Sequence, residues 1–485
     1  MEIENYTRNL TLLTDYYQIN MMYAHYKNDL LSKEVVFDVF FRKNPCGSGY
    51  TIFAGLEQVI EYINGLSFTE EDIEYLRGTY PYDEEFFHYL TNFKFTGNLW
   101  AVPEGTVIFP SEPVIRIETN LLEAHLIETA ILNIVNHQSL IATKASRILH
   151  AAENDPVLEF GLRRAQGPDA GIYGARAAYI GGVAATSNVL SGKLFNIPVK
   201  GTHAHAYVQS YPTELEAFLA FSEAFPNNAI LLVDTYNTIK SGIPNAIETF
   251  KQMKYKYGEK FVNYGIRLDS GDLAYLSKVG RKMLDDAGFP EAKIVASNDL
   301  DEFLIRDLKL QGAKIDIWGV GTNLIVSKNC PSLGFVYKLV AEKEQDEFKP
   351  KIKISENPEK ITTPGCKKSV RFYDQSTNRA ILDLMMLKEE EIPKDEFVAF
   401  DPINTWKKKA MKNFIAKELL VPVFEQGTQI YQSPSLEEIK LNARQELASL
   451  SEEIRRLKNP HIYHVDLSQQ LWDLKYDLIN NERKR

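Results

Sequence analysis

The strongest constraint on the fold is a regular alternation between residues 158 and 328, where short apolar runs separate longer segments of helical periodicity. Such alternation implies parallel strands joined by crossover helices. Strands are predicted at residues 157–162, 199–201, 229–233, 264–268, 293–296 and 315–318. Helices are predicted at residues 213–225, 243–255, 274–287 and 301–310. The series of units favours an irregular (β/α) barrel over a small open sheet.

Each predicted strand of this region is followed by charged, hydroxylic or glycine residues. In parallel α/β structures the carboxyl ends of the strands lie at one edge, where active sites are assembled. A single loop of this kind is more often an ordinary turn, but its recurrence after successive strands indicates an active site. These residues are Arg163, Arg164, Thr202, His203, His205, Asp234, Asp269, Asp272, Ser297, Asn298, Gly319, Gly321 and Thr322.

The rest of the chain indicates an α/β protein with three parts. Residues 1–125 mix strands and helices and form an N-terminal α/β domain, which residues 330–390 complete. Residues 126–329 contain the barrel. Residues 391–485 are a helical and mixed C-terminal appendage, in which a helix is predicted at 435–457 with Ser435 and Glu438 as its capping box. Residues 121–152 have helical spacing, and Asn136 marks a candidate break.

Composition narrows the class of protein. The 485 residues carry a net charge of -10, which argues against a broad positive surface for nucleic acid. The three cysteines are far apart and form no Cys-x-x-Cys pair, so a reducing compartment is expected. The first ten residues lack a signal-peptide pattern, and no apolar run is long enough to span a membrane. We therefore expect a cytoplasmic protein that binds neither nucleic acid nor membrane.

Two kinds of chemistry fit the loops. His203 and His205 suggest a metal hydrolase, but no further histidine occurs before His461, so a histidine-rich zinc site cannot be built. A phosphate site fits better. Residues 319–322 follow a strand and offer backbone N–H groups and a hydroxyl, while Arg163, Arg164 and Arg267 offer anion donors. Asp234, Asp269 and Asp272 could hold Mg²⁺ against a diphosphate. Together they suggest a phosphorylated sugar or nucleotide substrate.

Five motifs add a resemblance to a known family. Residues 14–18 (TDYYQ), 159–169 (EFGLRRAQGPD), 201–205 (GTHAH), 267–272 (RLDSGD) and 319–322 (GVGT) closely resemble nicotinate phosphoribosyltransferases, in the same order along the chain. The resemblance covers residues from about 6 to 375. It implies the type II phosphoribosyltransferase fold, with an N-terminal α/β domain packed on an irregular α/β barrel, and a homodimer as the active form.

The resemblance also implies a reaction. Nicotinate attacks C1 of phosphoribosyl diphosphate, which gives nicotinate mononucleotide and diphosphate in the first step of NAD salvage from nicotinate. ATP is a co-substrate whose hydrolysis drives the reaction through a phosphohistidine, and Mg²⁺ accompanies the diphosphate. The family's phosphorylated histidine corresponds to His205. His203 falls at a position that varies between relatives, so we expect it to support the site rather than react.

Other roles follow from the same resemblance, motif by motif. Phe160 would stack on one face of the pyridine ring, and Tyr17 of a partner subunit on the other. Arg163 or Arg164 would meet the nicotinate carboxylate or a substrate phosphate. Arg267 and Asp269 would contact the phosphoribosyl group, with Asp234 near its diphosphate and Thr202 in the same loop as His205; Asp234 and Asp269 are the expected Mg²⁺ contacts. The ribose and 5-phosphate end would be lined by Ser297, Asn298, Gly319, Gly321 and Thr322.

Substrate choice and some roles stay open. Nicotinamide-using relatives carry an aspartate in the segment that corresponds to residues 181–186, where this chain has no acid; a carboxylate there would repel nicotinate, so nicotinate is favoured. Nicotinamide or quinolinate as the base, and a barrel that binds without turnover, are the alternatives. Each of four residues also has a purely structural alternative. Tyr17 and Phe160 could be ordinary core aromatics, Asp272 could cap a helix, and Arg164 could pair with Asp169.

Overall fold

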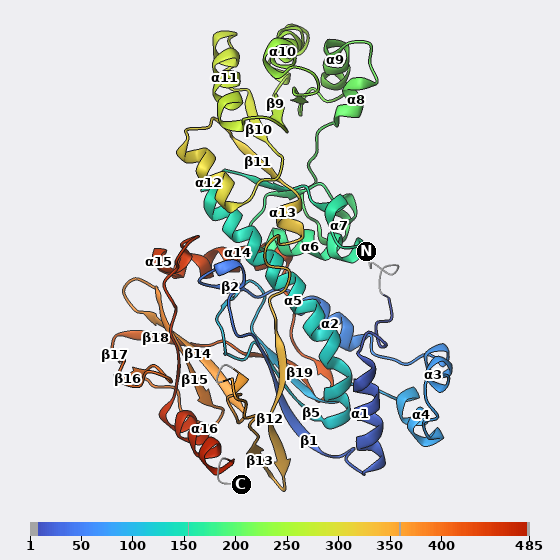
Figure 1. The fold of residues 1–485 in the computed structure, drawn as a ribbon, viewed down its shortest axis with the longest axis vertical. Helices are drawn as coiled ribbons and strands as arrows, with labels where there is room; N and C mark the ends of the chain where they lie inside the picture. Colours follow the sequence, from blue (N-terminus) through green and yellow to red (C-terminus); the bar gives the residue numbers. More distant parts are fainter. Residues whose placement is uncertain (1–7, 154, 358–359, 483–485) are drawn as a thin grey trace. The chain divides into compact units, whose positions relative to one another are not determined.

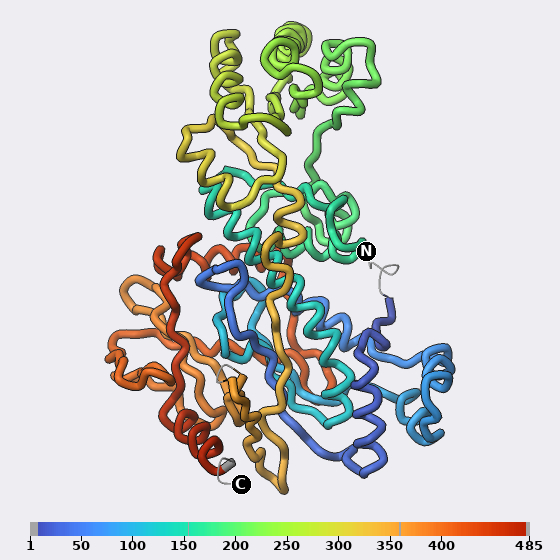
Figure 2. The backbone as a smooth tube through the Cα atoms, viewed as in Figure 1, coloured from blue at the N-terminus to red at the C-terminus, as the bar shows by residue number. Residues whose placement is uncertain are grey.

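The computed structural model describes residues 8–153, 155–357 and 360–482. It divides into two compact units (Figure 1): unit 1 comprises Met1–Leu140 and Ser332–Arg485, and unit 2 comprises Ile141–Pro331. Unit 1 is therefore built from both ends of the chain, and Figure 2 shows the blue N-terminal tube and the orange-to-red C-terminal tube running through the same body. Our finer division at residues 125 and 390 stays a prediction; residues 391–485 lie within unit 1.

Unit 1 is organised around a seven-stranded antiparallel sheet of order β13-β12-β1-β5-β3-β19-β20. The interior strand β1 (Glu34–Phe40) is buried along most of its length because it pairs on both sides, with β5 (Ile115–Asn120) and with β12 (Val336–Glu344). Residues 336–350 thus add two strands, β12 and β13, to the sheet that contains β1 and β5. Its other strands are β3 (Asn98–Ala101), β13 (Glu347–Pro350), β19 (Val421–Glu425) and β20 (Thr428–Gln429).

A second, four-stranded sheet of order β18-β14-β15-β21 belongs to the same unit. Val370 and Phe372 on β14 and Leu382 and Leu384 on β15 form the centre of an apolar cluster. Its strands are β14 (Lys367–Asp374), β15 (Ala380–Leu387), β18 (Phe414–Glu418) and β21 (Val465–Leu467). Two strand pairs complete the unit: β2 (Thr51–Ile52) with β4 (Val107–Ile108), and β16 (Phe397–Phe400) with β17 (Lys408–Met411).

Helices of unit 1 follow the predicted pattern with two differences. The helices are α1 (Tyr16–Lys27), α2 (Leu56–Asn64), α3 (Glu70–Arg77), α4 (Glu84–Thr91), α5 (Leu121–Ala152, of which residues after Leu140 belong to unit 2), α14 (Leu436–Ser449), α15 (Glu452–Arg455) and α16 (Gln469–Glu482). Helix α5 is unbroken at Asn136, whose side chain accepts the backbone N–H groups of Gly334 and Phe335. The predicted helix at 435–457 ends at Ser449 because Leu450 adopts an extended backbone, and α15 starts anew after Ser451.

Unit 2 contains a six-stranded parallel sheet of order β7-β6-β11-β10-β9-β8. The strands are β6 (Val157–Glu159), β7 (Ala185–Thr186), β8 (Ile230–Leu232), β9 (Gly265–Leu268), β10 (Lys293–Ala296) and β11 (Ile317–Val320). Beyond β7 the order continues through a single parallel bridge between Thr186 and Val199. The α/β prediction is confirmed. Barrel closure stays a prediction, because in the described residues of this unit no backbone ladder joins β8 to the Val199 segment.

Helices connect these strands, as the crossover rule requires. They are α6 (Pro168–Ile180), α7 (Val189–Phe195), α8 (His205–Gln209), α9 (Glu214–Ala224), α10 (Ile243–Tyr257), α11 (Leu273–Asp286), α12 (Glu302–Leu310) and α13 (Thr322–Ile325). The four helices predicted between residues 213 and 310 are all present, within about two residues at each end. The strand predicted at 199–201 is reduced to the Val199 bridge, and the two-residue strand β7 was not anticipated.

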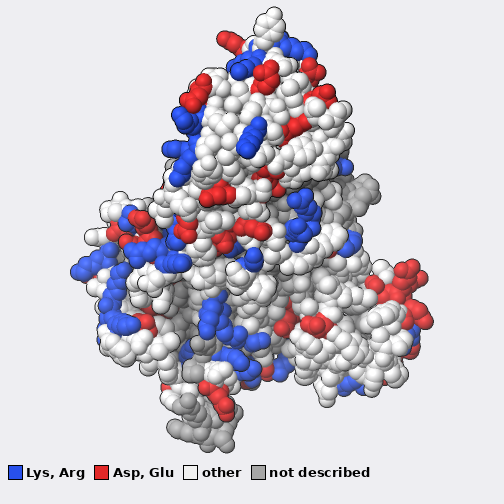
Figure 3. Space-filling view, turned by 45° about the horizontal axis from the view of Figure 1, so that its top comes forward, with Lys and Arg blue, Asp and Glu red and all other residues white. Residues whose placement is uncertain are grey.

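No helix in the described part of the chain is long and apolar enough to cross a bilayer. Lys and Arg are interspersed with Asp and Glu over much of the face that Figure 3 shows. All three cysteines are described, and none of them forms a disulfide.

Candidate functional site

The parallel sheet of unit 2 brings the predicted loop residues together. Strands β9, β10 and β8 are neighbours in the sheet, and the Thr186–Val199 bridge adds the chain that leads into the Gly201–His205 loop. Since parallel strands all end at the same edge, the loops that follow them form one rim. The loop residues predicted between positions 163 and 322 therefore lie within unit 2.

Arg267, on β9, is the centre of a hydrogen-bonded cluster. Its Nε donates to Ser297 Oγ at 2.9 Å, Nη1 donates to Thr202 Oγ1 at 2.9 Å, and Nη2 donates to Asp269 Oδ1 at 3.0 Å. Ser297 Oγ also donates to the same Asp269 oxygen. A planar guanidinium held on three sides keeps a fixed orientation. With the Arg267 side chain 15% and the Asp269 side chain 27% exposed, the cluster remains open to a ligand.

Asp234 has one oxygen engaged and one without a partner. Its Oδ2 accepts the backbone N–H of Asp269 at 3.0 Å and the hydroxyl of Ser270 at 2.6 Å. Its Oδ1 is buried and has no hydrogen-bond partner among the described residues. A buried carboxylate oxygen is costly to leave unsatisfied. The arrangement suits a cation or a ligand donor at this position.

His205 is the first residue of α8, and its ring contacts the loops after β8 and β9. Its Nδ1 lies 3.1 Å from Thr235 Oγ1, and its Nε2 lies 3.9 Å from Asp269 Oδ2. The side chain is 42% exposed. An accessible imidazole held between a hydroxyl and a carboxylate can act as a nucleophile or a proton carrier.

Phe160 follows β6 and packs beside the Arg267 cluster. Its backbone N–H donates to Val320 O at 2.8 Å, and the Arg267 guanidinium carbon lies 5.9 Å from the centre of its ring. A Cβ added at Gly319 would lie 2.8 Å from two carbons of that ring, so glycine is required there. Because the ladder between β6 and β11 continues to Val320, Gly319 belongs to the strand, and only Gly321 and Thr322 remain as a loop at the start of α13.

Glu159 is a site residue that the sequence analysis quoted only as part of a motif. It is fully buried; one oxygen accepts the backbone N–H of Gly161, and the other accepts the Thr186 hydroxyl at 2.6 Å. Burial raises the pKa of Glu159 above its ordinary value. The hydrogen bond from the Gly161 N–H to Glu159 fixes the turn that carries Phe160. A carboxylate that ends an apolar strand was the available signal for Glu159, whereas no signal singled out Thr235 and Ser270, which are the partners of His205 and Asp234.

Several predicted residues lie apart from this hydrogen-bonded cluster. In the described structure no hydrogen bond or ion pair joins Arg163, Arg164, Asn298 or Thr322 to it. The two arginines are exposed on a 3₁₀ turn, Leu162–Arg164. Asn298 is exposed with a left-handed backbone, φ 90°.

Three competing structural interpretations can now be compared with the coordinates. Asp272 is the N-cap of α11 and accepts the backbone N–H of Tyr275 at 2.9 Å, which confirms its structural role. Tyr17 lies on α1 in unit 1 and is 52% exposed. Phe160 is only partly buried. Neither aromatic is therefore an ordinary core residue.

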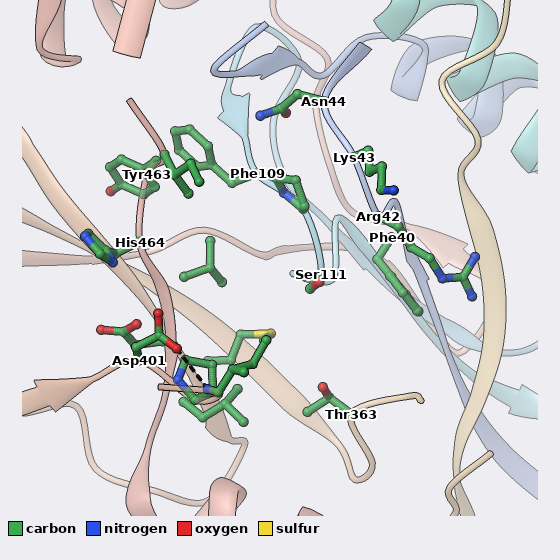
Figure 4. Close-up of a pocket in the computed structure, with 18 of the residues that line it drawn as sticks. Phe40, Arg42, Lys43, Asn44, Phe109, Ser111, Thr363, Asp401, Tyr463 and His464 are labelled. Carbon is green, nitrogen blue, oxygen red and sulfur yellow. Dashed lines mark hydrogen bonds between the residues drawn. The ribbon is translucent and has the colours of Figure 1, made fainter. Parts of the chain in front are cut away.

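A large cavity of about 1420 Å³ lies in unit 1 and contains none of the predicted site residues. In Figure 4, Arg42 and Lys43 lie on one side of it, and Asp401 and His464 on another. Tyr463 is stacked on Phe109 at a ring distance of 3.8 Å. The chemistry predicted from the sequence belongs to the unit 2 cluster, so cavity size does not identify the site here.

Comparisons with known proteins agree with the motif resemblance. Residues 12–136 match the model of the nicotinate phosphoribosyltransferase N-terminal domain, and residues 366–475 match that of its C-terminal domain. Nicotinate phosphoribosyltransferase of Bacillus subtilis (strain 168) is 48% identical over 478 residues, covering 98% of this chain and 96% of the relative. That of Dictyostelium discoideum is 36% identical over 524 residues, covering 96% and 88%.

One solved structure has the same fold over nearly the whole chain. The crystal structure of human nicotinic acid phosphoribosyltransferase has a TM-score of 0.82 and 30% identity, covering 96% of this chain and 100% of that one. Fold and site thus indicate the phosphoribosyltransferase class. The chain belongs to the nicotinate phosphoribosyltransferase family.

Proposed function

We propose that the chain transfers the phosphoribosyl group of phosphoribosyl diphosphate to nicotinate, giving nicotinate mononucleotide and diphosphate, the first step of NAD salvage from nicotinate. The observation that carries this proposal is the cluster around Arg267, which joins a guanidinium, Asp269, Asp234 and two hydroxyls at the ends of neighbouring parallel strands. Anion donors beside carboxylates suit a sugar that carries phosphates. Family membership supports the same reaction.

The transfer step places positive charge on C1 of the ribose as the diphosphate leaves. Arg267 and Asp269 would contact the phosphoribosyl group, and fixed donors aimed at the leaving group would stabilise it. The 5-phosphate end would lie against the loops after β10 and β11. These loops contribute Ser297, Asn298, Gly319, Gly321 and Thr322.

Nicotinate would be held by its ring and by its carboxylate. Phe160 would stack on one ring face, because its turn is fixed by Glu159 and it lies beside Arg267. Tyr17 of a second copy of the chain would cover the other face, which requires a homodimer; its 52% exposure leaves the ring available. Arg163 or Arg164 would pair with the carboxylate.

ATP would be coupled through His205. A ring nitrogen attacks the γ-phosphorus, the bond to the ADP oxygen breaks, and the N–P bond forms as the ring loses its proton; water later releases phosphate. Exposure of the imidazole and its place beside Asp269 support this role. Negative charge added at His205 would order the loops around the diphosphate.

Mg²⁺ would lie between the diphosphate and the carboxylates of Asp234 and Asp269. The unpartnered Oδ1 of Asp234 fits such a cation. In the described residues no three His, Cys, Asp or Glu side chains converge as a metal site, so most ligands would come from the diphosphate and water. The ion would neutralise charge on the leaving group.

The proposal is tested by mixing the protein with Mg²⁺, phosphoribosyl diphosphate and either nicotinate or nicotinamide, with and without ATP. Mononucleotide and ADP are then measured by chromatography. We expect nicotinate mononucleotide, in higher yield with ATP. Product from nicotinamide alone would overturn the base assignment, and no product from either base would overturn the reaction.

His205→Ala separates the ATP step from the transfer step. We expect loss of ATP hydrolysis and of ATP stimulation, with slower, uncoupled transfer retained. ATP stimulation that survives this substitution would contradict the phosphohistidine. Absence of nucleotide formation and of ATP hydrolysis in both the variant and the wild type would support a binding protein without turnover.

A further inference from the structure

The outer edge of β8 has a buried backbone N–H that no neighbouring strand accepts. Strand β8 pairs with β9 on one side, where Val233 N–H donates to Arg267 O. Backbone N–H groups alternate in direction along a strand, so the N–H of Leu232 points to the opposite side. Leu232 is 1% exposed. A buried N–H in this position needs an acceptor from elsewhere.

His203 supplies that acceptor. Its Nε2 accepts the Leu232 N–H at 3.2 Å. The bond crosses the gap between β8 and the chain that follows the Thr186–Val199 bridge, where the described residues of unit 2 have no backbone ladder. A side chain therefore performs the task that a strand pair would perform in a closed barrel.

The surroundings keep the His203 ring in place and neutral. The side chain is buried, and its ring centre lies 4.8 Å from that of Phe221 and 5.3 Å from that of Tyr207. Burial, reinforced by the charges of Arg267 and His205, lowers the pKa of His203 to about 4. At neutral pH the ring therefore retains an unprotonated nitrogen, which a charged imidazole would not have.

Two other residues of the same loop, Thr202 and His205, also contact neighbouring segments through their side chains. Thr202 Oγ1 accepts Arg267 Nη1, and His205 Nδ1 contacts Thr235 Oγ1. Leu232 and Thr235 belong to β8 and the loop that follows it. The two imidazoles thus bind two points of one segment, and the His203 bond is the one buried in the aromatic cluster.

We propose that His203 is a positioning residue that holds the 201–205 loop against the end of β8, and so sets the His205 ring beside Thr235 and Asp269. The inference rests on the proposed function, because it gives His203 a role in phosphorylation of His205. It needs no contact between His203 and any substrate.

Two substitutions test the role. His203→Phe keeps a ring for the aromatic cluster but removes the acceptor, whereas His203→Gln offers an amide oxygen to the Leu232 N–H. Tyr207→Phe is the matched control: it removes only a hydroxyl that donates to Tyr211 in the same cluster. Thermal unfolding of all three verifies that they fold.

The first measurement is hydrogen exchange of the Leu232 amide, which requires no activity. Loss of one buried hydrogen bond should speed exchange about tenfold in His203→Phe. His203→Gln should restore most of the protection, and Tyr207→Phe should match the wild type. Unchanged protection in His203→Phe would overturn the tie to β8.

The second measurement is labelling of His205 by ATP with a labelled γ-phosphate, compared with ATP-independent nucleotide formation. The ratio of labelling rate to uncoupled transfer rate should fall about tenfold in His203→Phe and recover in His203→Gln, because a displaced nucleophile loses its fixed geometry. A merely structural loss would lower both rates and leave the ratio unchanged, which would overturn the proposal.

The two failures are distinguishable. If the wild-type protein acquires no phosphate label that depends on His205, the proposed phosphohistidine is wrong, and so is the role of His203. Wild-type protein with normal label, together with normal label in His203→Phe, would overturn only the role of His203.

Discussion

Two arginine clusters, one in each unit, have similar partners but different surroundings. In unit 1, Arg371 is fully buried; it binds both oxygens of Asp383 at 2.7–2.8 Å and donates to Glu446 at 2.7 Å. In unit 2, Arg267 binds Asp269, Ser297 and Thr202, but remains partly exposed. Buried charges must be fully paired to be tolerated. A partly exposed charged group can keep hydrogen-bonding positions free for a ligand, because water satisfies them when no ligand is bound.

The comparison shows how to separate a stabilising cluster from a functional one. Arg371 also donates to the backbone oxygen of Val107, and Tyr463 donates to Asp383, so few groups of that network lack a partner. In the Arg267 cluster, Asp234 Oδ1 has no partner among the described residues. Glu112 Oε2, beside Asp383 and Arg371, is also buried without a partner among the described residues, so an unpartnered atom alone does not mark a functional site. Exposure distinguishes the two clusters: the Arg267 and Asp269 side chains are 15% and 27% exposed, whereas those of Arg371 and Asp383 are 0% exposed.

The largest expected effect is on stability, from Arg371→Ala. Removing the guanidinium leaves Asp383 as a buried charge without a counterion and leaves Glu446 with only Lys417, at 3.7 Å, which should cost about 5 kcal/mol of unfolding free energy. Urea unfolding followed on unit 1 measures it. Lys412→Ala, which breaks an ion pair with Glu396 between mostly exposed side chains, serves as the control and should change stability by less than about 0.5 kcal/mol. If both substitutions changed the free energy of unfolding equally, burial of the ion pair would not explain its contribution to stability.

Arg267→Ala should act on catalysis instead. Loss of the fixed donors should lower kcat/KM about 10³-fold, or about 4 kcal/mol of transition-state stabilisation, while the thermal midpoint moves by only a few degrees. Steady-state kinetics beside thermal unfolding gives both values. Lys282→Ala, on the exposed face of α11, controls for loss of a surface charge. A large drop in stability with normal turnover would assign the Arg267 cluster to the fold.

Acid should destabilise both units through a buried histidine in each. Burial lowers the pKa of His125 in unit 1 and of His203 in unit 2 from 6.5 to about 4. The unfolded chain then binds more protons than the folded one between these values, so stability present above pH 6.5 is lost as the pH falls towards 4. The loss should approach 3 kcal/mol for each histidine, as an order of magnitude (about 1.4 kcal/mol per pKa unit).

His125→Phe and His203→Phe sharpen this pH comparison. Neither ring nitrogen of His125 has a hydrogen-bond partner in the described structure, whereas His203 accepts Leu232 N–H. Both substitutions should flatten the pH dependence of unfolding, but only His203→Phe should also cost about 1 kcal/mol at pH 7. An unaltered pH profile in both variants would contradict the lowered pKa values.

A small effect on substrate binding, rather than on stability, is expected from Gly319→Ala. The added Cβ would meet the Phe160 ring at 2.8 Å, and the displaced ring should raise KM for nicotinate about tenfold, or about 1.4 kcal/mol. Initial rates at varied nicotinate concentration measure it. An unchanged KM would show that the position of the Phe160 ring does not set nicotinate binding.

Much of the architecture of unit 2 followed from local patterns. Helices α9 to α12 and strands β8, β9 and β10 were predicted close to their bounds because their apolar patterns and flanking turn signals are clear, whereas the strand predicted at 157–162 ends at Glu159. The two-residue strand β7 is too short to show any period. The helix predicted through 457 was wrong after Ser449, because apolar spacing does not distinguish one helix from two with the same face.

Which side chains of the site contact one another depends on the order of neighbouring strands in the sheet. Residue types alone placed His205, Asp234, Asp269 and Ser297 in loops after strands, and Arg267 near the end of one, since polar groups in series at strand ends have few structural reasons to occur. They did not show that Glu159 fixes the Phe160 turn or that His203 bonds Leu232. Thr186 lies 27 residues from Glu159, and Leu232 lies 29 residues from His203 in sequence.

Local sequence thus determined which elements form and which residues stand at their ends, because periodicity and turn chemistry act over a few residues. Strand order and burial determined which of those residues meet and which atoms stay unsatisfied. An unpaired oxygen on Asp234 and a neutral ring at His203 exist only when distant segments exclude water from them. Their chemistry is a property of the assembled unit, although the residues that provide it are visible in the chain.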